Sequence, residues 1–145
     1  MYTKHNPISF TIVDREKALD MVKRNDSEGF RRNLDTLIKI AKGDGVRVVL
    51  FAFLQAKEEF LSRNRDDFKG IEKAWVVALD KHYQIMKELS EQYEIPFIIP
   101  DQSLFEDSWF IDNCHLNEQG EKMKANILFN YFDSSKEVYF VDVGL

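Results

Sequence analysis

Two short apolar stretches constrain most strongly what this chain can fold into. Residues 46–54 read VRVVLFAFL and residues 95–99 read IPFII, both rich in β-branched side chains. Such nearly continuous apolar runs are typical of strands that are covered on both faces, as in parallel sheets. A helical pattern over residues 71–93 separates the two runs and supplies the crossover that a parallel pair needs. We therefore expect the two strands to be parallel neighbours.

Helical periodicity fills most of the remaining chain. The spacing predicts helices over 14–25, about 26–43, 71–93 and 117–132. Asp14 is the expected N-cap of the first helix, and either Asp26 or Ser27 caps the second. Residues 55–70 read as a loop, residues 102–115 as an irregular segment, and residues 137–143 as a candidate edge strand. The order helix, strand, helix, strand, helix predicts an α/β layered sheet with right-handed crossovers.

Composition narrows the class of protein. At 145 residues the chain has the size of one domain, 1–145. A net charge of -5 argues against a nucleic-acid partner. The longest apolar run is too short to span a bilayer, so no transmembrane segment is expected, and the first residues lack a secretory pattern. The single cysteine, Cys114, excludes an internal disulfide. The localisation is not assigned, because an acidic charge balance with a single cysteine suits cytoplasmic and exported proteins equally.

Asp112 and His115 form the one pattern that points to chemistry. They stand three residues apart, after a predicted strand and loop and before a predicted helix. In open α/β sheets, sites form outside the carboxyl ends of strands. A carboxylate there can hold one ring nitrogen of a histidine, which leaves the other nitrogen to take a proton from a nucleophile. The alternative is a loop aspartate that caps a turn beside a half-buried histidine.

The segment Asp-x-x-His-Leu-Asn-x-x-Gly, residues 112–120, closely resembles the last conserved block of the SGNH (GDSL-type) hydrolases. The preceding helices and strands of that family also have similar counterparts in this chain. The helices resemble residues 30–38 and 81–89, and the strands that follow them resemble residues 45–50 and 95–98. The similarity covers about residues 26–132. It implies a three-layer flavodoxin-like (SGNH-hydrolase-like) α/β fold with a parallel sheet that is incomplete at its N-terminal side.

The resemblance also implies residue roles. His115 would be the general base and Asp112 its orienting partner in a serine esterase or acylhydrolase that works through an acyl-serine intermediate. No metal or organic cofactor is implied, and acylated carbohydrates, short acyl esters and lysophospholipids all suit the family. Leu116, Asn117 and Gly120 would act structurally: packing under the loop, capping the helix and allowing close helix approach.

The nucleophile of that family is missing. Its Gly-Asp-Ser block has no counterpart, so the chain resembles the C-terminal half to two thirds of such an enzyme and is expected to be inactive alone. Asn25 is the candidate oxyanion residue, although Lys23 stands where the family has glycine and the neighbouring Asp26 is also suited to helix capping. An unpaired edge of strand 46–54 would favour self-association, or pairing with residues 8–13 or 137–143.

Other interpretations stay open at this point. Cys114 beside His115 suits a thiol nucleophile or a metal pair, and His82 suits a partly exposed boundary position better than catalysis. Trp109 and Phe110 suit either a substrate pocket or loop anchoring in the core. A non-catalytic flavodoxin-like interaction module is the competing function.

Overall fold

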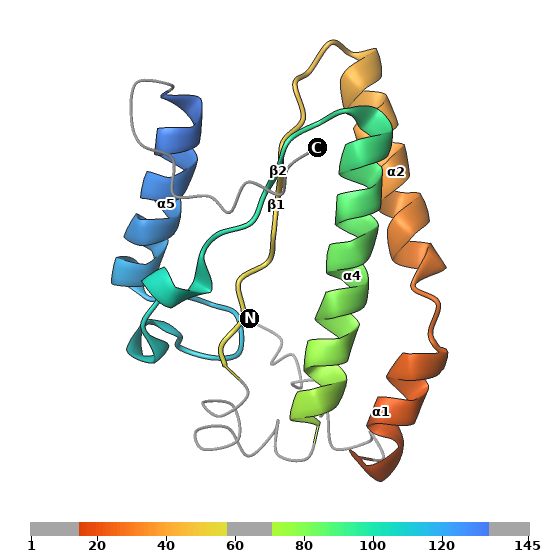
Figure 1. The fold of residues 1–145 in the computed structure, drawn as a ribbon, viewed down its shortest axis with the longest axis vertical. Coiled ribbons are helices and arrows are strands. Elements are labelled where there is room, and N and C mark those ends of the chain that lie inside the picture. Colours follow the sequence, from red (N-terminus) through yellow and green to blue (C-terminus); the bar gives the residue numbers. More distant parts are fainter. Residues whose placement is uncertain (1–14, 58–70, 134–145) are drawn as a thin grey trace, which may run out of the picture.

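Helices dominate the architecture. The computed structural model describes residues 15–57 and 71–133 (Figure 1). The α-helices in that part of the chain are α1 (Arg15–Arg24), α2 (Glu28–Gly43), α4 (Glu72–Tyr93) and α5 (Glu118–Phe132). The strands are β1 (Leu50–Phe51) and β2 (Phe97–Ile98), and the short 3₁₀ helices are η2 (Gln102–Leu104) and η3 (Asp107–Trp109). Among these helices, none combines the length and apolar composition that crossing a membrane requires.

The two strands pair in parallel, as predicted. Leu50 lies opposite Phe97 and Phe51 opposite Ile98. The Leu50 N–H donates to the Pro96 carbonyl at 2.9 Å, and the Ala52 N–H donates to the Ile98 carbonyl at 2.8 Å. The prediction that residues 71–93 form the crossover between them is confirmed by α4.

The predicted three-layer flavodoxin-like sheet is wrong. The sheet of the described residues has only β1 and β2, each two residues long, within a mostly helical structure. The stretch 46–54 is apolar enough for a longer strand, but a ladder extends only as far as its partner does. The partner strand β2 begins at Phe97, directly after Pro96, which has no N–H to donate. Residues 8–13 and 137–143, considered as further strands, lie outside the described residues.

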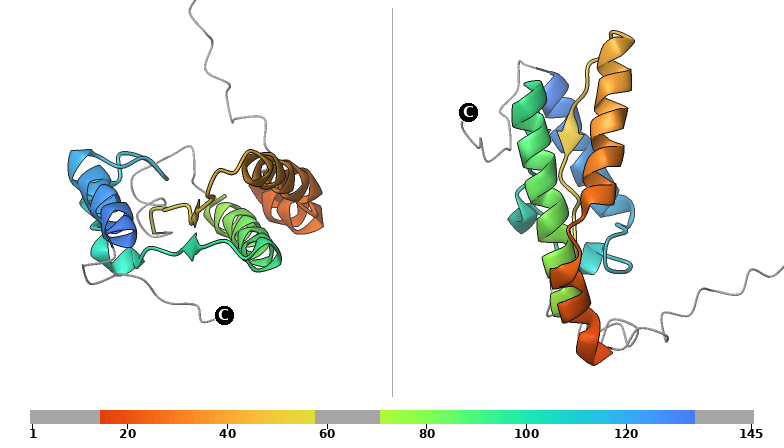
Figure 2. Two further views of the ribbon diagram at one scale, coloured as in Figure 1. Left: turned by 90° about the horizontal axis from the view of Figure 1, so that it is seen from above. Right: turned by 90° about the vertical axis from the view of Figure 1, so that its right-hand side faces the viewer.

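Helices flank the strand pair on both sides. Seen from above in Figure 2, α5 lies on one side of the strands and α2 with α4 on the other. Each side has its own apolar core. The α5 side is built on Leu54, Ala56, Ile98, Phe105, Phe110, Leu116 and Ile127. The α2 and α4 side is built on Ile38, Leu50, Ile85 and Leu89. Leu37 falls within the apolar spacing of α2, yet its side chain is 64% exposed.

A polar junction joins α1 to α2. The N–H of Glu28 donates to Asp26 Oδ1 at 3.0 Å, and the N–H of Ser27 donates to Asn25 Oδ1 at 2.9 Å. Ser27 occupies the N-cap position with a left-handed φ of 58°, and its side chain makes no capping bond. Of the two caps considered from the sequence, Asp26 therefore supplies the interaction. Asp14, the expected cap of α1, lies outside the described residues.

Candidate active site

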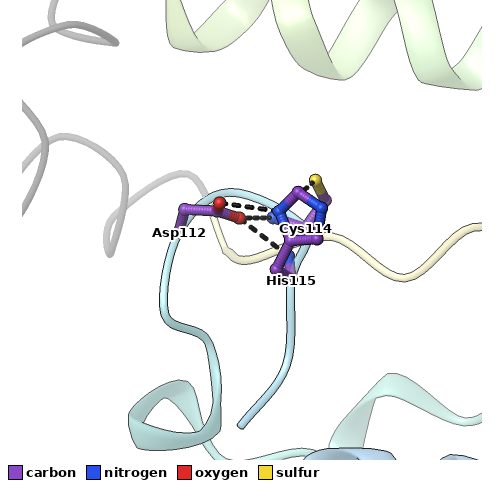
Figure 3. Close-up of side chains that lie close together, drawn as sticks. All are labelled: Asp112, Cys114 and His115. Carbon is purple, nitrogen blue, oxygen red and sulfur yellow. Dashed lines mark hydrogen bonds and ion pairs between the residues drawn. The ribbon is translucent and has the colours of Figure 1, made fainter. Parts of the chain in front are cut away.

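A narrow hairpin-like loop presents Asp112 and His115. Phe110 and Leu116 form an isolated antiparallel bridge, and the Ile111 N–H donates to the His115 carbonyl at 2.9 Å. Both Phe110 and Leu116 are buried in the core beneath the loop. The loop is therefore anchored at its base by apolar side chains and closed by backbone hydrogen bonds. Figure 3 shows the three polar side chains that gather at its tip.

This loop is tied to the chain that follows β1, because the Ala56 N–H donates to the Asn113 carbonyl at 2.9 Å. The neighbouring Gln55 carbonyl accepts a hydrogen bond from the Gln102 side chain on η2. The loop thus lies at the carboxyl end of the strand pair, where the sequence placed the site. Asn113, Gln55 and Gln102 were not singled out from the sequence. Their only signal is that they are polar residues next to apolar runs, which many surface residues share.

Asp112 is held from three directions. Its Oδ2 lies 2.7 Å from His115 Nδ1, and its Oδ1 accepts the backbone N–H groups of Cys114 at 2.9 Å and His115 at 2.7 Å. Partial burial raises the pKa of the Asp112 carboxyl, but the two backbone donors and the His115 ring outweigh it and lower that pKa to about 2. Asp112 is therefore ionised at neutral pH.

The ionised carboxylate selects the tautomer of His115. A carboxylate only accepts hydrogen bonds, so a neutral His115 carries its proton on Nδ1 and donates it to Asp112. Nε2 is then the nitrogen that can accept a proton from another group. The His115 side chain is 71% exposed, so this nitrogen belongs to an accessible ring. The predicted contact between the two residues is confirmed, while their catalytic roles stay predictions.

Cys114 completes a group of three potential metal ligands with Asp112 and His115. Their ligand atoms lie within 4.8 Å of one another, and Cys114 Sγ lies 3.6 Å from His115 Nδ1. However, burial and then the negative charge of Asp112 raise the pKa of the Cys114 thiol. A protonated thiol is a weak nucleophile and a poor metal ligand. The hydrogen bond to Asp112 also engages Nδ1. The arrangement therefore suits an Asp–His pair better than a thiolate or a metal site.

Asn25 is not brought to this loop. It lies at the α1–α2 junction, across α4 from the loop (Figures 1 and 2), where its Oδ1 accepts the Ser27 N–H. The structural interpretation of this segment, a helix-capping junction, accounts for its hydrogen bonds. The proposed oxyanion role of Asn25 gains no contact that would support it.

The aromatic residues before the pair anchor the loop. Phe110 is 5% exposed, and Trp109 packs edge-on against Phe105 with ring centroids 6.2 Å apart. Core packing, one of the two alternatives, therefore describes both. His82 is partly buried and stacks on Phe30, as a boundary histidine would. Its pKa is lowered by burial.

The residues that start α5 have the structural roles expected of them. Leu116 is buried, and Asn117 Oδ1 accepts the N–H groups of Gln119 and Gly120 at 3.0 and 3.1 Å. A Cβ at Gly120 would lie 2.9 Å from the Leu116 side chain, so glycine permits the close approach.

No described serine hydroxyl hydrogen-bonds His115. The hydroxyl of Ser90 donates to the Lys87 carbonyl, and that of Ser108 donates to Glu106. Comparison with protein-family models, with curated proteins and with solved structures found no match to this chain. A functional assignment therefore depends on the geometry of the loop.

Proposed function

We propose that this chain supplies the base and its orienting carboxylate to a serine esterase or acylhydrolase of the SGNH type. The observation that carries the proposal is the 2.7 Å contact between Asp112 Oδ2 and His115 Nδ1, made by a carboxylate that two backbone amides hold in place. Catalytic function belongs to a site rather than to a fold, so the proposal rests on this pair of side chains and draws no support from the three-layer fold, which the described residues do not form.

The proposed reaction uses the two nitrogens of His115 differently. Nδ1 stays hydrogen-bonded to Asp112, while Nε2 removes the proton from a serine hydroxyl as its oxygen attacks the ester carbonyl carbon. The resulting imidazolium is stabilised by the Asp112 carboxylate. It then donates the proton to the departing alkoxide, which leaves an acyl-serine. Water, deprotonated in turn by His115, hydrolyses this intermediate.

The proposal needs a serine nucleophile and oxyanion donors in addition to residues 1–145, because this chain holds no Gly-Asp-Ser block. The substrate is a small-molecule ester, such as an acylated carbohydrate or a lipid, and no nucleic-acid partner is proposed. The isolated chain is expected to show essentially no turnover, because loss of one member of a triad lowers the rate by several orders of magnitude.

A complementation assay tests the proposal. A strand and Gly-Asp-Ser turn from an SGNH hydrolase, joined to the N-terminal side of the chain or added as a fragment, should create hydrolysis of a short p-nitrophenyl ester. That activity should be lost in His115→Ala and reduced in Asp112→Asn. Asp101→Asn is the matched control, because Asp101 is another loop aspartate that accepts a backbone N–H, from Ser103 at 2.8 Å.

Two results would contradict the proposal. One is turnover in the complemented protein that does not depend on His115. The other is labelling of a serine in the isolated chain by a fluorophosphonate probe together with turnover, which would place the nucleophile within residues 1–145.

A non-catalytic interaction module is the second candidate, and the exposed apolar side chains favour it. Leu37, Ile40, Val46 and Phe53 are each more than half exposed, on α2 and beside the strand pair. The sheet order is β1–β2, so β1 has a neighbouring strand on one side only among the described residues. Self-association through this open edge is the form of interaction that these features support.

A further inference from the structure

One peptide group connects the Asp112–His115 loop to the chain that follows β1. The carbonyl of Asn113 and the N–H of Cys114 belong to this planar group. Its carbonyl accepts the Ala56 N–H at 2.9 Å, and its N–H donates to Asp112 Oδ1 at 2.9 Å (Figure 3). Because the peptide group is rigid, the contact with Ala56 fixes the direction from which the Cys114 N–H meets the carboxylate.

The Ala56 N–H is itself held through its own peptide group. It shares that planar group with the carbonyl of Gln55, which accepts a hydrogen bond from the side-chain amide of Gln102. Gln102 is the first residue of η2, and this turn is capped because Asp101 Oδ1 accepts the Ser103 N–H at 2.8 Å. The amide of Gln102 therefore donates from a backbone turn that is fixed by its own hydrogen bond.

These successive hydrogen bonds all point the same way. They form a relay from the side-chain amide of Gln102, through the peptide groups 55–56 and 113–114, to the carboxylate of Asp112. Each peptide group accepts at its carbonyl and donates from its N–H, so each bond polarises the next and strengthens it by about 10–30%. Ala56 is 1% exposed and Asn113 is 8% exposed, so the bond between them is shielded from water.

The relay ends on the carboxylate that holds His115. Asp112 Oδ2 lies 2.7 Å from His115 Nδ1, and this contact selects the tautomer of the ring. We propose that Gln102 is a positioning residue for the Asp112–His115 pair, which it orients across two peptide groups. The catalytic consequence rests on the proposed esterase function, whereas the relay can be measured in the isolated chain.

Nuclear magnetic resonance of the full chain tests the relay directly. A scalar coupling across the hydrogen bond should join the Ala56 nitrogen to the Asn113 carbonyl carbon. At about pH 8, where histidine is ordinarily neutral, long-range ¹H–¹⁵N spectra should show His115 mainly with its proton on Nδ1. Absence of the coupling, or a majority of the Nε2–H tautomer, overturns the relay.

Substitution of Gln102 tests its part in the relay. Gln102→Met keeps the length of the side chain and removes its donor. The amide protons of Ala56 and Cys114 should move upfield, and the ratio of the Nδ1–H to the Nε2–H tautomer of His115 should fall on the order of twofold. Gln92→Met is the matched control at an exposed position of α4 and should change none of these signals. Gln102→Lys keeps an N–H donor and should restore the Cys114 signal.

The outcomes separate the relay from the proposed function. Unchanged Cys114 and His115 signals in Gln102→Met, or equal changes in Gln92→Met, overturn the relay whatever the activity of the complemented protein. In that protein, Gln102→Met should lower kcat on the order of tenfold and leave KM unchanged, because it disturbs the base rather than ester binding. An increase in KM with kcat unchanged overturns the positioning role. If the spectra change as expected but complementation yields no turnover that depends on His115, the esterase proposal fails and the relay stands.

Discussion

The Asp112 carboxylate links the geometry of one loop to the stability of the protein. Its pKa is about 2 in the folded protein, against an ordinary value of 3.8. A carboxyl with a lowered pKa contributes stability above its unfolded value, and that contribution is lost as the pH falls through the folded value. The window in which Asp112 matters is therefore between about pH 4 and pH 2.

Asp112→Asn should lower the free energy of unfolding by about 2 kcal/mol at pH 5, since the carboxyl is only 24% exposed. The difference from the unmodified chain should shrink as the pH falls towards 2, where the carboxylate becomes protonated in both states. Urea unfolding at several pH values measures it. If the difference in the free energy of unfolding between the two proteins is the same at every pH, the pKa of Asp112 is not lowered in the folded protein.

Gly120 offers a second test at the scale of one residue. Gly120→Ala places a methyl group 2.9 Å from the buried Leu116 side chain, and such overpacking costs about 1–3 kcal/mol. Gly29→Ala is the matched control in α2, where a Cβ meets nothing within 4 Å. There the helix propensity of alanine should stabilise by up to about 1 kcal/mol. The midpoint of thermal unfolding should therefore fall in Gly120→Ala and rise in Gly29→Ala. If both midpoints move in the same direction, the close packing of Gly120 against Leu116 is contradicted.

At the scale of elements, one lysine holds α1 against α4. Lys81 on α4 donates from Nζ to the backbone carbonyls of Val22, at 2.6 Å, and of Lys23 and Asn25. These carbonyls lie at and just beyond the C-terminal end of α1, where a cation also interacts favourably with the helix dipole. Lys81 and Val22 are 59 positions apart in the sequence, so this contact joins two distant segments of the chain.

Lys81→Met keeps most of the aliphatic stem and removes the donor. It should cost about 1–2 kcal/mol and increase amide hydrogen exchange along α1 before the rest of the chain. Lys73→Met removes the same charge from an exposed position of α4 and should have little effect. If α1 exchanges equally in both variants, the lysine does not secure that helix.

At the scale of the whole molecule, the strand pair leaves apolar surface exposed. Two-stranded sheets are marginally stable by themselves, and the outer edge of β1 has no strand beside it among the described residues. Phe53, just beyond β1, is 59% exposed. We expect the chain to self-associate in solution through this edge.

Sedimentation velocity at increasing concentration should reveal dimers or larger species. Phe53→Lys should shift the distribution towards monomer, because a charged side chain disfavours pairing at a strand edge. Met21→Lys on α1 introduces the same charge at a residue that is 61% exposed, away from the strands, and should change nothing. A concentration-independent monomer would rule out this assembly.

The helices and the start of α5 could be predicted because their interactions are local. The cap at Asn117 reaches amides two and three residues away, and the Asp112 contact spans three residues. The extent of the sheet could not be predicted in this way. The apolar pattern of residues 46–54 indicates that this segment is readily buried. A strand ladder also requires a partner strand, and β2 provides one for only two residues.

The sequence alone therefore determined the helical segments, the parallel pairing of two apolar runs and the meeting of Asp112 with His115. Tertiary structure decided how little of the sheet forms, that Lys81 reaches α1, and that Ala56, in the chain after β1, bonds to the loop at Asn113. It also decided that Gln55 Oε1 is buried with no hydrogen-bond partner in the part of the chain that the structure describes. The physical reason is distance along the chain. Local hydrogen bonds are specified by neighbouring residues, but burial and long-range pairing depend on which distant segments the packed helices bring together.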